Sequence, residues 1–193
     1  MKKLMLLLMV GLLATGLSEN AVAQDLPGMD ASPVDVAYYP SRVALRAFAN
    51  TDEAKNAQPV IRVMYSRPQK KGRVVFGELE KFGSVWRAGA NESTEIMFMR
   101  DVMLGDTTIP AGRYTLHVGL EQENWTIYVS SDLDTWGSYS FNPEASTVAM
   151  LEVPTEATSE VVEAFSIAFT ESEDGAHMIM AWDETMVRVP FKF

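Results

Sequence analysis

The chain has 193 residues, of which 26 are Asp or Glu and 16 are Lys or Arg, so its formal net charge is -10. This acidity argues against binding to nucleic acid or to an anionic membrane surface, because both carry negative charge. The absence of cysteine excludes disulfides, and a chain of this length buries enough apolar surface to fold without them.

Residues 1–23 predict a secretory signal peptide. Two lysines follow Met1, an apolar run extends from Leu4 to about Leu13, and Ala21-Val22-Ala23 forms a small-residue cleavage site. The apolar run is too short to span a bilayer, which disfavours the alternative of an N-terminal anchor. We therefore expect cleavage after Ala23 and a periplasmic or secreted protein with no transmembrane anchor in its mature form.

Residues 24–58 predict an N-terminal extension to the core of the domain. Prolines interrupt this segment, short strands are expected at Val34–Tyr39 and Val43–Phe48, and the polar run Asn50–Pro59 is typical of a loop. The core is expected at residues 59–193. Extension and core together form one domain.

From residue 60 onward, short β-branched and aromatic runs recur between turn residues. The expected strands are Val60–Tyr65, Val74–Phe76, Thr94–Met99, Arg113–Val118, Asn124–Val129, Thr147–Val153, Phe165–Thr170, Met178–Trp182 and Met186–Phe191. The segment Thr155–Ala164 is the one place where a short helix or a loop is expected. Alternation with period two predicts an all-β fold, an antiparallel β-sandwich or a barrel-like sheet with little helix.

The stretch from Tyr65 to Glu95 concentrates arginines in an acidic chain, so these cations need internal carboxylates or a polar or anionic ligand as partners. An arginine fork suits a carboxylate, a phosphate or a sugar diol, and Asn and Glu supply further hydrogen-bonding groups. The candidate ligand-binding residues are Tyr65, Arg67, Arg73, Arg87, Asn91, Glu92, Thr94 and Trp136. In the alternative, the arginines form ion pairs with Glu78 or Glu92 that only hold loops in place. Lys70 and Lys71 are interpreted as solvated turn residues.

Aromatic side chains offer a second kind of site, a stacking platform for a sugar ring. Trp125 and Trp182 lie in alternating strands and are expected in the core. Trp136 lies in a polar loop with Tyr139 and Phe141 nearby, and it is the better stacking candidate because exposed loop aromatics often bind ligands.

Known catalytic and metal-binding motifs are missing from the sequence. It contains no nucleophile elbow, no His-Glu-x-x-His and no phosphate-binding glycine loop. The Asp132-Leu133-Asp134 run fails as a calcium loop because Trp136 and Pro143 occupy ligand positions. Since His117 and His177 are the only histidines, we expect no metal site and no cofactor.

Several longer motifs resemble one known family. They are Tyr65-Ser66-Arg67-Pro68, Lys71-Gly72-Arg73, Phe76-Gly77, Val85-Trp86-Arg87, Gly89-Ala90-Asn91-Glu92, Pro110-Ala111-Gly112, Tyr114, Trp125, Trp136-Gly137 and Trp182. From about Ser32 to Phe193 the chain resembles domain of unknown function 2911, found in secreted proteins of Bacteroidetes-type bacteria. The resemblance implies a secreted or periplasmic, mostly β domain, and it supplies no catalytic residues.

Three functions are consistent with these residues. The favoured hypothesis is an exported protein that binds a small polar or anionic ligand, with a saccharide as one candidate. The second is a hydrolase acting on the envelope or on glycans, with Glu92 as general acid or base, which requires burial of that carboxyl. The third is a structural or interaction module of the cell envelope, whose protein partner the sequence does not identify.

Overall fold

The strands form a single antiparallel sheet. The computed structural model describes residues 26–193, so the predicted signal peptide lies outside the described residues. The sheet runs in the order β1-β2-β4-β7-β8-β9-β10-β5-β6, and β3 pairs with β7. The strands are β1 (Val34–Tyr39), β2 (Ile61–Ser66), β3 (Val85–Trp86), β4 (Thr94–Phe98), β5 (Val102–Leu104), β6 (Thr107–Ile109), β7 (Gly112–Leu120), β8 (Asn124–Ser130), β9 (Thr147–Ser172) and β10 (Gly175–Lys192).

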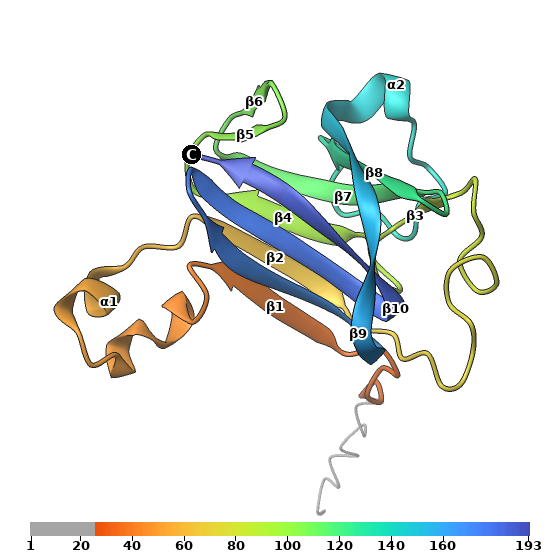
Figure 1. The fold of residues 1–193 in the computed structure, drawn as a ribbon, viewed down its shortest axis with the longest axis horizontal. Helices are drawn as coiled ribbons and strands as arrows, with labels where there is room; N and C mark the ends of the chain where they lie inside the picture. Colours follow the sequence, from red (N-terminus) through yellow and green to blue (C-terminus); the bar gives the residue numbers. More distant parts are fainter. Residues whose placement is uncertain (1–25) are drawn as a thin grey trace, which may run out of the picture.

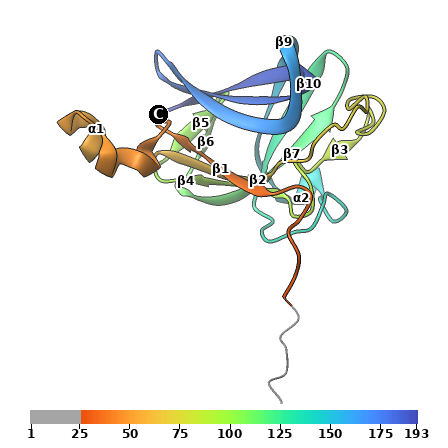
Figure 2. The ribbon, with the colours of Figure 1, turned by 90° about the horizontal axis from the view of Figure 1, so that it is seen from below.

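The long strand β9 rolls this sheet over on itself. Its residues 147–154 pair with β8, and its residues 155–172 pair with β10. Figures 1 and 2 show β9 and β10 crossing over the layer made by β1, β2, β4 and β7. The prediction of an all-β antiparallel fold is confirmed, and both layers belong to one open sheet.

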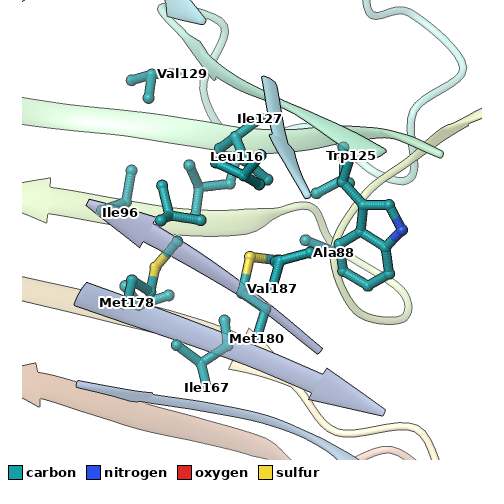
Figure 3. Packing of buried hydrophobic residues seen from close by; sticks show 14 of the residues in the cluster. Ala88, Ile96, Leu116, Trp125, Ile127, Val129, Ile167, Met178, Met180 and Val187 are labelled. Carbon is teal, nitrogen blue, oxygen red and sulfur yellow. The ribbon is translucent and has the colours of Figure 1, made fainter. Parts of the chain in front are cut away.

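Alternating strand residues fill the space between the two layers. Ile61 and Val63 of β2 are fully buried. Figure 3 shows Met178 and Met180 of β10 on one side of the core and Leu116 of β7 on the other. Each such side chain contributes about 1.5–3 kcal/mol of hydrophobic stabilisation.

Aromatic rings close one end of this core. The indoles of Trp86 and Trp182 stack with centroids 5.9 Å apart, and Phe76 packs against both and against Trp125. Trp125 and Trp182 are buried, as predicted.

Two of the expected strands do not form. Val43–Phe48 is a 3-10 helix, η1, rather than a strand; its alanines, leucine and arginine favour helix over strand. Val74–Phe76 belongs to no strand because its backbone bonds to a distant side chain and to its own turn rather than to a neighbouring strand. The Val75 N–H donates to the Asp183 carboxylate at 3.1 Å, and the Glu80 N–H donates to the Val75 carbonyl at 2.9 Å.

The segment Thr155–Ala164 is neither a helix nor a loop but the middle of β9. Its register against β10 shifts on both sides of Asp183, which pairs with Val162, while Thr185 pairs with Ala157. The extra residues in β9 form a bulge, and a bulge disturbs the alternation from which a strand is recognised.

Short helices occupy two connections. Helix α1 (Asp52–Asn56) lies in the predicted polar loop and begins where the Thr51 hydroxyl accepts the Ala54 N–H at 3.2 Å. Helix α2 (Pro143–Ser146) precedes β9. Within residues 26–193 no helix is long and apolar enough to cross a membrane.

Candidate functional site

Tyr65 serves the interior of the fold. The ring lies in the core, 4% exposed, against the edge of Phe165. Its hydroxyl accepts the Ile167 N–H at 3.0 Å and faces the Ile167 carbonyl at 3.4 Å. Burial raises the pKa of the Tyr65 phenol above its ordinary value. The side chain thus satisfies backbone groups of β9 from the neighbouring layer.

Arg67 links three parts of the chain. Its Nε donates to the Phe165 carbonyl at 3.1 Å, its Nη2 to the Ser166 hydroxyl at 2.8 Å, and its Nη1 to the Asp35 carboxylate at 2.9 Å. Pro68 favours an extended backbone at Arg67. The guanidinium is therefore engaged between β1 and β9.

The residues that follow Arg67 pair with β9 through their backbone. The Phe165 N–H donates to the Pro68 carbonyl at 2.9 Å, and the Lys70 N–H donates to the Glu163 carbonyl at 2.8 Å. Gln69 forms a bridge with Ala164. We call this contact between residues 65–71 and 163–167 the seam, because it joins the edge of the first layer to the edge of the second.

Lys70 is not the solvated turn residue that the sequence suggested. Its ammonium pairs with the Asp183 carboxylate, and the two side chains are only 17% and 13% exposed. Asp183 sits at a positive φ of 56° in β10, opposite the bulged part of β9. Because the partner lies 113 residues away, local sequence carries no signal for this pair.

Arg73 and Arg87 both act on Glu80, a carboxyl that the sequence analysis did not single out. Arg73 donates to the carbonyls of Gln69 and Lys70 at 2.6 and 2.8 Å. Arg87 is half-buried, and its Nε has no hydrogen-bond partner among the described residues. Burial raises the pKa of the Glu80 carboxyl, and the charges of Arg87 and Arg73 oppose that rise.

The ion pairs of this block differ from those expected. Arg67 pairs with Asp35, and Glu78 lies 3.7 Å from Lys81. Glu92 is exposed and forms no ion pair within residues 26–193. Arg67 and Arg73 thus have different partners, because Arg67 bonds across the seam to β9 whereas Arg73 bonds the carbonyls of Gln69 and Lys70 on its own side.

Asn91, Glu92 and Trp136 come together at a different place. The connection after β8, which we call the Trp136 loop (residues 131–142), lies against the chain between β3 and β4. Glu92 and Trp136 form an antiparallel bridge. The Trp136 indole remains 60% exposed. Thr94, next in this segment, is buried and donates its hydroxyl to the Ala88 carbonyl.

The Trp136 loop is tied to this segment by five hydrogen bonds. Ser93 is the centre of three of them. They run from Ser93 N–H to Thr135 O (3.0 Å), Gly137 N–H to Asn91 O (2.9 Å), Thr135 Oγ1 to Ser93 Oγ (3.0 Å), Ser138 Oγ to Val85 O (2.8 Å), and Ser93 Oγ to Gly137 O. These bonds use the backbone of Asn91, and neither the Asn91 amide nor the Glu92 carboxylate makes a side-chain hydrogen bond within residues 26–193.

His117 anchors the other end of this loop. The His117 imidazole is 1% exposed and stacks on the Phe141 ring with centroids 4.0 Å apart. Its Nδ1 has no hydrogen-bond partner among the described residues. Burial lowers the pKa of His117 to about 4, and the charge of Asp132 only partly opposes this. The loop therefore rests on a neutral imidazole.

A hollow lies elsewhere in the fold. It has a volume of about 870 Å³ and lies between η1, α1 and the ends of β1 and β9. Its charged walls carry both signs, Arg42 and Arg46 against Glu53 and Glu171, and it contains none of the candidate ligand-binding residues. No cluster of metal-ligating side chains occurs among the described residues. We therefore place the candidate site at the Trp136 loop.

Replacing Arg67 tests the seam. Arg67→Ala removes three hydrogen bonds, one of them charged on both sides, and we expect the free energy of unfolding to fall by about 2 kcal/mol. Urea denaturation measures it. The matched control is Arg188→Ala, which removes an exposed ion pair with Glu156 outside the seam, with an expected loss below about 1 kcal/mol. Equal losses in the two variants would contradict the role of Arg67 at the seam.

Acid titration tests His117. Because its folded pKa lies below the unfolded value, its contribution is complete above pH 6.5 and is lost as the pH falls toward 4. We expect His117→Phe to abolish about 3 kcal/mol of the stability loss between pH 7 and pH 4. Urea denaturation at each pH measures this difference. Leu116→Ala, which removes a buried side chain of the same strand but no ionisable group, should retain the wild-type slope, and an unchanged slope in His117→Phe would refute the buried neutral imidazole.

Comparison with known proteins places this fold in a family without identifying its activity. The family model "Protein of unknown function (DUF2911)" matches residues 49–191, well over half of the chain. No curated protein and no solved structure matches this chain. The resemblance inferred from the motifs is confirmed, and the chain belongs to the DUF2911 family.

Proposed function

We propose that this protein binds a saccharide without transforming it, and that the Trp136 loop is the binding site. The observation that carries the proposal is the 60% exposure of Trp136 in a loop held by five hydrogen bonds. The indole offers apolar area to the C–H face of a sugar ring. The free side chains of Asn91 and Glu92 lie in the adjoining segment and suit its hydroxyl groups.

The order of the loop supports this use. Binding loses affinity when a loop must be immobilised, and a loop already fixed by hydrogen bonds avoids much of that loss. Ser93 and Gly137 make most of these bonds, and none of the bonds uses the Trp136 side chain. The backbone of the loop is thus held in place while the Trp136 indole stays exposed.

The other candidate residues support the fold instead. Tyr65 and Arg67 are used at the seam, and Thr94 is buried against the Ala88 carbonyl. Arg73 bonds the carbonyls of its own turn, and the charges of Arg87 and Arg73 oppose the rise in the pKa of the Glu80 carboxyl. The proposal therefore rests on three of the candidate residues, Asn91, Glu92 and Trp136. Since none of the three is an arginine, the expected ligand is a polar saccharide rather than an anion held by arginines.

The geometry offers less to a glycan hydrolase based on Glu92. A carboxyl that acts as a general acid near neutral pH is usually buried, whereas Glu92 is exposed. An exposed carboxylate suits a hydrogen bond to a sugar hydroxyl better than proton donation to a glycosidic oxygen.

Removing the indole tests the proposal. Trp136→Ala should abolish saccharide binding, with a loss of at least about 2 kcal/mol, while the melting temperature stays close to wild type because the ring is largely exposed. Titration calorimetry against a panel of soluble neutral, amino and anionic glycans measures the affinity. The matched control is Phe48→Ala, which removes an 84% exposed ring from η1. Absence of binding to every glycan in wild type, or retained affinity in Trp136→Ala, would refute the proposal.

Glu92→Ala separates binding from hydrolysis. We expect it to weaken saccharide binding by about 0.5–1.5 kcal/mol, the value of one hydrogen bond. The same titration measures the affinity, and chromatography of the recovered glycan detects cleavage. Products that wild type forms and Glu92→Ala does not would favour the hydrolase.

A further inference from the structure

We infer that Tyr139 forms a second stacking surface beside Trp136, so that the Trp136 loop binds a linear, uncharged oligosaccharide across two adjacent subsites. This inference rests on the proposed function and specifies its ligand. The sequence analysis grouped Tyr139 with other loop aromatics but did not place it at the site.

Tyr139 is the more exposed ring of the loop. It is 88% exposed, whereas Phe141, two residues further on, stacks on His117 and contacts Tyr128. Exposed rings add little to folding stability, because burial is the source of that stabilisation. The loop therefore uses Phe141 as its anchor and leaves Tyr139 open to solvent.

The Tyr139 ring nevertheless lies against the backbone of Gly137. A Cβ atom at Gly137 would lie 2.6 Å from Cε2 and 2.8 Å from Cδ2 of Tyr139, so the ring lies directly against the glycine backbone. Gly137 has a positive φ of 68° and is held through its N–H and carbonyl by Asn91 and Ser93. Since Gly137 directly follows Trp136, the two exposed rings flank one fixed turn.

Two rings on one fixed turn suit successive residues of one chain. A ligand that reaches both surfaces gains the second contact within the same complex, so affinity rises with the number of sugars. A monosaccharide reaches only one of the rings. The expected ligand class is therefore a linear oligosaccharide rather than a free sugar.

The charges around the loop select against anionic glycans. Glu92 is exposed beside Trp136, and Asp134 lies two residues before it. Arg113, a cation at this loop, is already paired with Asp134 and with Glu95, the latter at 2.7 Å. A uronate or a sulfated sugar would be repelled by the exposed Glu92 carboxylate, and Arg113 would have to leave a carboxylate partner to bind it, whereas an uncharged sugar meets no such repulsion.

A length series tests the inference. Cello-, xylo- and manno-oligosaccharides of one to six sugars are titrated by calorimetry into wild type, Trp136→Ala, Tyr139→Ala and Tyr139→Phe. In at least one series we expect wild-type affinity to rise about tenfold or more from one sugar to four. Tyr139→Ala should lose this rise while keeping the monosaccharide affinity, and Tyr139→Phe, which keeps the ring, should retain it. Melting curves confirm that each variant is folded.

The outcomes distinguish this inference from the proposed function. If Trp136→Ala abolishes binding but Tyr139→Ala leaves the length dependence intact, the second subsite is refuted and saccharide binding stands. Tighter binding of oligogalacturonate than of every neutral series would overturn the selection against anionic glycans. If wild type binds none of these glycans, both proposals fail.

Discussion

The seam between residues 65–71 and β9 is the constraint on which the rest of the structure depends. A rolled sheet that stays open leaves two edges facing each other, and buried edge groups without partners are costly. Here the Tyr65 hydroxyl bonds the Ile167 backbone, Arg67 bonds the Phe165 carbonyl, and the backbone of Pro68 and Lys70 continues the contact. Two side chains and a few backbone hydrogen bonds thus take the place of a full strand pairing and hold the second layer over the first.

That closure explains two of the cations in the 65–95 block. Arg67 pairs with Asp35 because its side chain lies between β1 and β9, and Lys70 pairs with Asp183, which lies opposite the bulge of β9. Because the Lys70 and Asp183 side chains are only 17% and 13% exposed, removing one of them would leave the other charge without a partner, which costs more than the pair contributes. The motif from Tyr65 to Arg67 is therefore explained by folding, without a ligand.

Sequence reasoning succeeded where the information is local. Alternation over a few residues identified β1, β2, β4, β7 and β8 closely, and a tryptophan in a polar loop was recognised as exposed. It was wrong at η1, which was read as a strand although its composition favours helix. It was also wrong where partners are remote. The bulged middle of β9 was read as a helix or loop, and Lys70 was read as solvated because its partner is 113 residues away. Which arginine faces which carboxylate depends on the roll of the sheet, so the division of the 65–95 block was beyond local patterns.

The fold does not explain the two exposed rings of the Trp136 loop. The hydrogen bonds of the Trp136 loop run through Ser93, Thr135, Gly137 and Ser138, and they would form with any side chain at positions 136 and 139. The packing of the loop is supplied by Phe141 on His117. Two large rings that are 60% and 88% exposed therefore contribute little to stability and expose apolar area to water. Stacking against a sugar, as proposed, would give both rings a role and would also use the free side chains of Asn91 and Glu92.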